Sequence, residues 1–277
     1  MKLVNGYTLL EYARKNSYIL PAFNTTNYEL SKGIIEALQE SKIGGIIQIS
    51  SSNLEISSPD FIVSMVNFLM EDATYPVTLH LDHAKSFKDV KKCVDSGFTS
   101  VMIDSSHLPF EQNIKEVQQA VKYCHYFNIP VEAELGSISG KEEDRILGGE
   151  GKTNPDKVRE FVEETNCDLL AVSVGNVHGL DIQPNLDLQL LENISKESSV
   201  PLVLHGGSGI PYDQIREAKK SNLIKVNFGA DLRKQFIRTF GQEYEKNKNA
   251  FDVKSLSIRA TENVKKKALE IMYEINK

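Results

Sequence analysis

The segment PLVLHGGSGIPYDQIREAKK, residues 201–220, contains the unit from which the rest of the chain is built. A short apolar run at residues 201–204 leads into a polar, glycine-rich turn. A segment with helical character follows at residues 211–220, with proline near its first position. A buried strand followed by a helix predicts a parallel strand-and-crossover unit, because parallel neighbours in a sheet need a long connection.

The same alternation of strand and helix runs along the whole chain. Eight runs rich in Val, Ile and Leu predict strands at residues 18–23, 45–49, 77–81, 99–103, 130–135, 169–174, 201–204 and 223–226. Amphipathic segments predict helices at residues 29–40, 60–70, 110–127, 155–165, 186–195 and 211–220. Eight such units favour an α/β fold closed into a (β/α)8 TIM barrel, with additional C-terminal helices. A Rossmann sheet is disfavoured, because PAFNTTNYE, which includes the end of the first run, lacks GxGxxG.

Composition limits the organisation and the partners of the protein. The chain has 277 residues, a formal net charge of −6 and no linker-like stretch, so we expect one domain over residues 1–277. The acidity argues against nucleic acid as a partner. No apolar run approaches the roughly 18 residues that span a bilayer. The charged N-terminal segment is not typical of a signal peptide, and three scattered cysteines are typical of reduced thiols. We therefore expect a cytoplasmic protein with no membrane or nucleic-acid partner.

Polar or ionisable residues stand at or just beyond the end of each predicted strand. They are Asn24, Ser50, Asp82 with His83, Asp104, Glu134, His178, His205 and Asn227. In an α/β barrel the carboxyl ends of the strands form the rim that carries the active site. A polar loop explains Ser and Asn at such positions, but it does not explain three of the six histidines of the chain together with three carboxylates.

Three of these residues, His83, His178 and His205, predict a catalytic zinc site, because three imidazoles with an open fourth position suit that metal. Glu134 and Asp104 are candidate oxygen ligands for an alternative metal position. Asp82, beside His83, is a candidate for proton transfer on a substrate hydroxyl, or for orienting a histidine.

Two glycine-rich segments predict contacts with a substrate. In LHGGSGIP, residues 204–211, glycines and the start of a helix favour binding of an anion, and the loop KVNFGAD, residues 225–231, follows the eighth strand. The long segment at residues 136–153 resembles a lid in composition, and its Glu142 or Glu143 is a candidate mobile base. From the residues alone, a solvated charged loop is the simpler interpretation of that segment.

Together these segments resemble the class II fructose-bisphosphate and tagatose-bisphosphate aldolases. The matching motifs run in order over nearly the whole chain: HLDHA (80–84), TSVMIDSSHLPFEQN (99–113), VEAELGSISGKEED (131–144), VGNVHG (174–179), LHGGSGIP (204–211) and KVNFGADLR (225–233). The resemblance implies zinc on the three histidines and a second or resting metal position at Glu134 and Asp104. It implies that Asp82 acts on the C4 hydroxyl and that Glu142 transfers the proton on the enediolate side.

The resemblance also implies how the substrate is held. The expected binding residues are Asn24, Ser50, Gly179, Gly206, Gly207, Ser208, Asn227, Gly229, Ala230, Asp231 and Arg259. A monovalent cation, Na+ or K+, is expected on carbonyls near Val177, Gly206 and Ser208. Arg259 matches an arginine that reaches the site of a partner subunit, so a homodimer or homotetramer is expected. Ala230 stands where the family usually has a threonine that contacts phosphate.

The implied reaction is reversible cleavage of a ketose bisphosphate to dihydroxyacetone phosphate and glyceraldehyde 3-phosphate. Fructose 1,6-bisphosphate is the first candidate substrate and tagatose 1,6-bisphosphate the second. A sibling aldolase for another phosphorylated keto sugar and a catalytically silent sugar-phosphate-binding paralogue stay open. A Schiff-base aldolase would need a lysine deep in the barrel, but the sixth strand, LLAVSVG, contains none, and Lys225 shares the eighth strand with the phosphate loop. A metal-dependent hydrolase would usually have an HxH pair on the first strand, which here reads YILPAFN.

Overall fold

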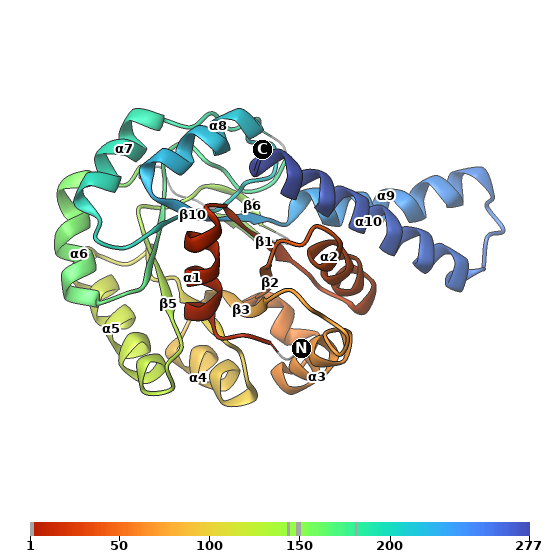
Figure 1. Cartoon of the computed structure of the whole chain (residues 1–277), viewed down its shortest axis with the longest axis horizontal. Coiled ribbons are helices and arrows are strands. Elements are labelled where there is room, and N and C mark those ends of the chain that lie inside the picture. The colour runs from red at the N-terminus through yellow and green to blue at the C-terminus, as the bar shows by residue number, and fades with distance from the viewer. Residues whose placement is uncertain (1–2, 143–144, 148–150, 181) are drawn as a thin grey trace.

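The computed structural model describes residues 3–142, 145–147, 151–180 and 182–277, with only the backbone for residues 141, 142 and 145–147. Eight strands form a closed barrel in the order β1-β10-β9-β8-β5-β4-β3-β2 (Figure 1). The strands are β1 Leu20–Asn24, β2 Gly45–Ser50, β3 Val77–Ala84, β4 Ser100–Ile103, β5 Val131–Leu135, β8 Leu169–Val172, β9 Leu202–Leu204 and β10 Leu223–Phe228. All neighbouring pairs are parallel, which confirms the predicted TIM barrel.

Helices surround the barrel. They are α2 Tyr28–Glu40, α3 Pro59–Leu69, α4 Phe87–Ser96, α5 Phe110–Tyr126, α6 Val158–Thr165, α7 Leu188–Glu197 and α8 Tyr212–Ala218, and the short 3-10 turns are η1 Ser51–Glu55, η2 Pro155–Lys157 and η3 Lys219–Ser221. Several begin at a side-chain cap. The Asn27 side chain, for example, accepts from the Leu30 backbone N–H at 3.0 Å. The helix predicted at residues 155–165 opens with η2 instead of a full α-turn, because Asn154 and Pro155 form a tight cap there.

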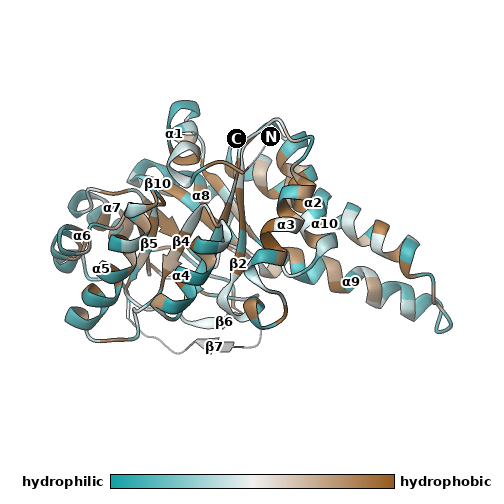
Figure 2. Ribbon diagram, turned by 90° about the horizontal axis from the view of Figure 1, so that it is seen from below, coloured by the Kyte–Doolittle hydropathy of each residue, from teal (hydrophilic) through white to brown (hydrophobic). Residues whose placement is uncertain are grey.

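A further helix, α1 Gly6–Asn16, covers the amino-terminal end of the barrel, where Leu9 and Ala13 pack against the inner residues Leu20 and Met102. Figure 2 shows α1 at one end of the barrel and the short strand β6 at the other. Apolar side chains of α1 and of the strands therefore close the amino-terminal end of the barrel. The polar strand ends face the opposite, carboxyl-terminal end.

Two long helices complete the chain, α9 Ala230–Lys246 and α10 Val253–Ile275. They lie side by side and extend well beyond the barrel (Figure 1), as the prediction of additional C-terminal helices requires. The other end of α10 packs on α2. A Cβ at Gly33 of α2 would lie 2.6 Å from the Thr261 carbonyl oxygen, so a glycine is required for this close contact. Within the described ranges, no helix is long and apolar enough to cross a membrane.

The segment 136–153 contains a small antiparallel hairpin of β6 Gly140–Glu142 and β7 Arg145–Leu147. Its base is attached to the segment that carries His178, because the His178 backbone N–H donates to the Ser139 carbonyl at 2.9 Å. Gly140 has a φ of +122°, and a Cβ there would lie 2.3 Å from the His178 carbonyl oxygen. The side chain of Glu142 and all of Glu143, the two candidate mobile bases, lie outside the described residues.

Candidate active site

Two adjacent residues of β3, Asp82 and His83, both contribute to the interior of the barrel. Successive strand residues normally point to opposite faces. Here the β3–β4 register shifts between Leu81 and Ala84, and His83 has a φ of +48°, in the left-handed region. Such a conformation costs a non-glycine residue about 1–3 kcal/mol and is kept where the surroundings enforce it. The bulge turns the His83 side chain toward the same cavity as Asp82.

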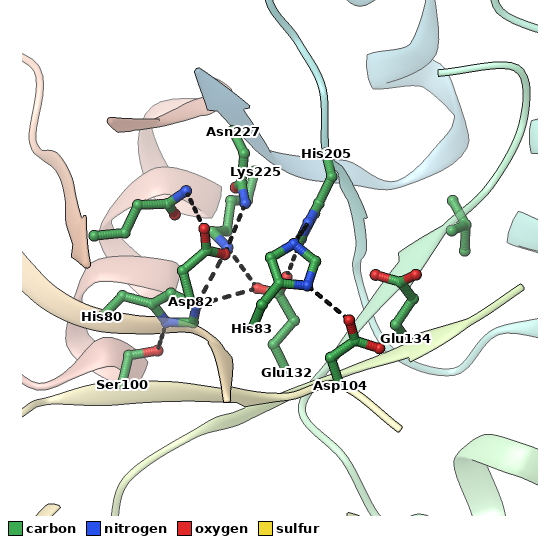
Figure 3. A network of polar contacts seen from close by, with 12 residues as sticks. His80, Asp82, His83, Ser100, Asp104, Glu132, Glu134, His205, Lys225 and Asn227 are labelled. Carbon is green, nitrogen blue, oxygen red and sulfur yellow. Dashed lines mark hydrogen bonds and ion pairs between the residues drawn. The ribbon is translucent and has the colours of Figure 1, made fainter. Parts of the chain in front are cut away.

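His83 and His205 form the centre of the site (Figure 3). His83 Nε2 lies 2.8 Å from Nδ1 of His205, which follows β9 directly. The outer nitrogen of each ring contacts a carboxylate: His83 Nδ1 lies 2.9 Å from Asp104 Oδ2, and His205 Nε2 lies 2.7 Å from Glu132 Oε1. Each carboxylate fixes the orientation of its ring and leaves the other nitrogen facing its neighbour.

The third histidine, His178, lies in the loop beyond the end of β8 instead of directly at the strand end. Asn176 holds this loop against β9, because its Nδ2 donates to the His205 carbonyl oxygen at 3.0 Å. The His178 ring centroid is 5.5 Å from that of His83 and 6.0 Å from that of His205. One ligand atom from each histidine lies within 4.8 Å of the others.

These three buried imidazoles fit a metal ion. Burial, and next the charge of His83, lowers the pKa of His205 well below its ordinary value, so the ring is neutral and has a lone pair to offer. The carboxylates behind His83 and His205 are the outer partners that zinc-binding histidines usually have. Among the described residues the set consists of three imidazoles with no fourth protein ligand, a donor set that suits a catalytic metal ion such as zinc.

A second group of possible ligands consists of His83, Asp104 and Glu134. The Ser106 hydroxyl donates to Asp104 Oδ1 at 2.8 Å and lies 3.1 Å from Glu134 Oε1. Glu134 Oε2 is buried and has no hydrogen-bond partner in the described part of the chain. Burial, and next the charge of Asp104, raises the pKa of Glu134 well above its ordinary value. A cation would satisfy this oxygen and keep the carboxylate ionised.

Asp82 is fully buried, and side-chain amides from three neighbouring strands surround its carboxylate. Asn24 Nδ2 donates to Oδ2 at 2.8 Å, Gln48 Nε2 to Oδ2 at 3.2 Å, and Asn227 Nδ2 to Oδ1 at 3.2 Å. These three amides hold the Asp82 carboxylate in place beside the histidine cluster. This geometry suits a group that exchanges a proton with a bound molecule.

A second layer of polar side chains lies inside the barrel beneath the strand-end residues. The sequence pattern of polar strand ends did not predict this layer. Lys225 Nζ lies 2.6 Å from Glu132 Oε2, and His80 Nδ1 lies 2.8 Å from Ser100 Oγ (Figure 3). Period-two alternation is the signal that finds this layer. Its members lie two residues before strand-end residues and so share their face: Gln48 before Ser50, His80 before Asp82, Glu132 before Glu134, and Lys225 before Asn227.

This layer bears on the Schiff-base alternative. A lysine that forms an imine must offer a free amine near the substrate. Lys225 is only 1% exposed and is paired with Glu132 beneath the histidines, so it does not offer one. His80, which is buried inside β3, belongs to the same polar network.

A small pocket adjoins the histidines at the carboxyl end of the barrel. It is lined by Asn24, His178, Gly179, Gly206, Ser208, Asn227, Gly229, Ala230 and Arg233. Most of these residues were expected from the sequence, whereas Arg233 was not. Gly206 has a φ of +62°, and a Cβ there would lie 2.1 Å from the Val177 carbonyl oxygen, so the two glycine-containing loops meet closely.

Some expected binding residues lie elsewhere or are already engaged. The Gly207 N–H donates to the Asn227 carbonyl at 2.8 Å, and the Asp231 N–H donates to Ser208 Oγ at 3.2 Å. Ser50 Oγ lies 2.9 Å from Ser52 Oγ at the end of β2. Arg259 lies on the α9–α10 arm and pairs with Glu243 at 3.1 Å, outside the pocket of its own chain.

Comparisons with known proteins agree with this architecture. Residues 4–277 match the family model described as fructose-bisphosphate aldolase class-II. Fructose-bisphosphate aldolases of Staphylococcus epidermidis and Staphylococcus aureus are each 36% identical over 269 residues, which cover 96% of this chain and 94% of theirs. The crystal structure of the YdjI aldolase from Escherichia coli K12 superposes with a TM-score of 0.85 at 31% identity, covering 99% of this chain and 97% of that one.

A fructose-bisphosphate aldolase from Campylobacter jejuni has the same fold, with a TM-score of 0.83 at 20% identity over 99% of this chain and 95% of that one. Barrel, histidine cluster and sequence relatives together define an enzyme of the aldolase class, a lyase that breaks carbon–carbon bonds in carbohydrate metabolism. The chain belongs to the class II fructose-bisphosphate aldolase family.

Proposed function

We propose that the protein is a zinc-dependent aldolase that reversibly cleaves a ketose bisphosphate to dihydroxyacetone phosphate and glyceraldehyde 3-phosphate. Fructose 1,6-bisphosphate is the first candidate substrate and tagatose 1,6-bisphosphate the second. One observation carries the proposal: the three-histidine cluster, the Asp82 carboxylate and the glycine-lined pocket lie together at the carboxyl end of the barrel.

Zinc held by His83, His178 and His205 would supply a Lewis acid that polarises the substrate carbonyl. The protein's own contribution is to fix the ligands: Asp104 and Glu132 hold the outer nitrogens of His83 and His205. We also propose that Glu134 and Asp104 form a second or resting metal position, which the buried Glu134 Oε2 supports.

Asp82 accepts the proton of the C4 hydroxyl, the C3–C4 bond breaks, and the aldehyde phosphate leaves. The three amides around Asp82 keep its carboxylate aimed and stop it from becoming a metal ligand. The remaining three-carbon enediolate takes a proton at C3. Glu142 is the proposed donor, on the strength of the resemblance alone, because its side chain is outside the described residues.

The pocket at Gly179, Gly206 and Ser208 is proposed to bind the phosphate of the dihydroxyacetone end, together with the backbone of Gly229 and Ala230. Gly207 and Asp231, whose N–H groups are engaged within the protein, are proposed to hold the two loops in place around it. Asn24 and Ser50 are proposed to line the far end of the sugar, away from the dihydroxyacetone phosphate. The close approach of Gly206 to the Val177 carbonyl supports a Na+ or K+ ion on the carbonyls of these loops.

We further propose a cytoplasmic, single-domain subunit that acts as a homodimer or homotetramer, with Arg259 completing the site of a second copy. The α9–α10 arm supports this assembly, because it projects from the barrel and exposes Ile237, Tyr244, Phe251, Val253 and Ile258. The second phosphate of the bisphosphate would lie at the open rim of the barrel and needs a hydrogen-bond donor there. Arg259 on the α9–α10 arm of a neighbouring subunit can provide that donor.

An aldol-cleavage assay over three sugars tests the proposed function. The zinc-loaded enzyme is offered fructose 1,6-bisphosphate, tagatose 1,6-bisphosphate and a keto-deoxy sugar acid phosphate, and release of the three-carbon product is followed. Turnover of a ketose bisphosphate supports the proposal. Turnover of the acid phosphate alone makes the protein a sibling aldolase, which the alanine at position 230 favours. Absence of cleavage with all three, although they bind, identifies a silent paralogue.

A further inference from the structure

A positively charged side chain, that of Arg233, lies at the glycine-lined pocket. It belongs to the first turn of α9, just beyond Ala230, and is half-buried. Neither the strand-end pattern nor the resemblance assigns it a role. The segment before Arg233 has two small residues, Gly229 and Ala230, which also line the pocket.

Space, and not backbone conformation, requires glycine at position 229. Gly229 has a φ of −127°, which any residue can adopt. A Cβ there would lie 2.8 Å from Arg233 Nη2 and 3.0 Å from Asn24 Oδ1. The missing side chain at position 229 therefore leaves the room in which the Arg233 guanidinium lies across the backbone at the edge of the pocket.

The surroundings of this guanidinium suit an anion with several oxygens. The 17-residue helix α9 begins at Ala230, so its partly positive amino terminus faces the same pocket. A guanidinium adds planar, paired donors that match the oxygens of a phosphate. Asn227 Oδ1, buried beside the pocket, has no hydrogen-bond partner among the described residues and can accept from a hydroxyl of the same ligand.

The geometry points to Arg233 as the residue that binds the phosphate of the dihydroxyacetone end, in place of the hydroxyl that Ala230 lacks, with Gly229 as the residue that makes room for it. This inference rests on the proposed function in one respect, that the substrate is a phosphorylated ketose. It identifies Arg233 as a specificity-determining residue that selects a phosphate, rather than a neutral hydroxyl, at that end.

The first test uses the zinc-loaded enzyme in the direction of condensation, where the two halves of the substrate are varied separately. Arg233→Ala should raise KM for dihydroxyacetone phosphate about 10- to 100-fold, the scale of a hydrogen bond to a charged group. KM for glyceraldehyde 3-phosphate and kcat should stay near the wild-type values, because a contact made equally in ground and transition states affects KM alone. Arg233→Lys should restore part of the loss, since it keeps the charge but not the paired donors.

Lys234→Ala is the matched control. Lys234 is the exposed neighbour on α9, so its substitution removes the same charge from the same turn without touching the pocket. It should leave KM for dihydroxyacetone phosphate unchanged. Equal effects of Arg233→Ala and Lys234→Ala would overturn the inference, because the arginine would then act only through long-range charge.

The second test measures binding of inorganic phosphate by calorimetry and so needs no turnover. Wild-type enzyme and Lys234→Ala should bind it, and Arg233→Ala should bind it about 10- to 100-fold more weakly. Gly229→Ala should weaken binding in the wild-type background and much less in the Arg233→Ala background, because the added Cβ acts by displacing the guanidinium. Equal phosphate affinity of wild type and Arg233→Ala would contradict the inference. If phosphate binding depends on Arg233 but none of the three sugars is cleaved, the proposed function is wrong. The role of Arg233 in binding phosphate is then still supported.

Discussion

His205 Nδ1 and His83 Nε2 lie 2.8 Å apart in the buried centre of the barrel. At this distance the two nitrogens share a proton in a hydrogen bond, and a metal cation can take the place of that proton. The far nitrogen of each ring is held by a carboxylate from a different strand, Asp104 behind His83 and Glu132 behind His205. The pair is thus oriented before any ligand arrives. A metal that binds there replaces a proton and finds both rings already oriented by their carboxylates.

Glu132 links the histidine cluster to the deeper polar layer, so we predict that Glu132→Gln affects both zinc affinity and stability. Loss of the carboxylate behind His205 should weaken zinc about 10- to 100-fold. It should also leave Lys225 buried without its counter-ion, at a cost of about 3–5 kcal/mol in the free energy of unfolding. Chelator competition measures the affinity, and urea unfolding of the metal-free protein measures the stability.

The double variant Glu132→Gln with Lys225→Met is the control for this prediction. It removes both buried charges and should recover much of the stability while zinc affinity stays low. If zinc affinity returns together with stability, Glu132 acts only by supporting the fold, and its role in orienting His205 is wrong.

Asp82 is predicted to act on the substrate and not on the metal. Asp82→Ala should keep zinc and lose cleavage by roughly 10²–10⁴-fold, the usual scale for a general acid or base. Metal content is measured by elemental analysis and cleavage by steady-state kinetics on the same preparation. Loss of zinc from the variant would make Asp82 a residue that orients the metal ligands.

Glu142 is predicted to exchange the proton at C3 of dihydroxyacetone phosphate. Glu142→Ala should slow exchange of that hydrogen with solvent deuterium, which NMR follows without the aldehyde. An exchange rate equal to that of the wild type would reassign the role, with Glu143 as the next residue to substitute.

Arg259 is predicted to act in the site of a neighbouring subunit. Arg259→Ala should raise KM for the bisphosphate, because the exposed arm would lose the cation that reaches the second phosphate. Sedimentation should show a dimer or tetramer. A fully active monomer, or an unaltered KM in the variant, would refute this assignment.

The sequence predicted the barrel because each buried strand is a separate apolar run, and it predicted that the three histidines lie together because strand ends of a parallel barrel share one rim. It placed His83 in that cluster but did not reveal how the side chain turns inward, because a left-handed residue inside a strand breaks the alternation on which such patterns depend. Helix α4 was also missed, although Ser86 and Gly97 are residues typical of its two caps.

Other features depend on contacts that no local pattern reveals. Glu132 and Lys225 stand far apart in the chain and meet only across the closed barrel. In the sequence, Arg233 cannot be distinguished from the other charged residues of its helix. Only the structure shows that Gly229 leaves space for its guanidinium. Alternation along each strand would have marked Gln48, His80, Glu132 and Lys225 as interior residues, and their polarity would have marked the second layer.

The central claim is that the three histidines hold a zinc ion on which aldol cleavage depends. Purified protein is stripped with a chelator, checked by elemental analysis, assayed with fructose 1,6-bisphosphate and tagatose 1,6-bisphosphate, and then titrated with zinc. The account predicts that cleavage of at least one of these sugars disappears with the metal and returns in proportion to zinc, up to one ion per active site. Full cleavage by a preparation shown to be free of metal would contradict it.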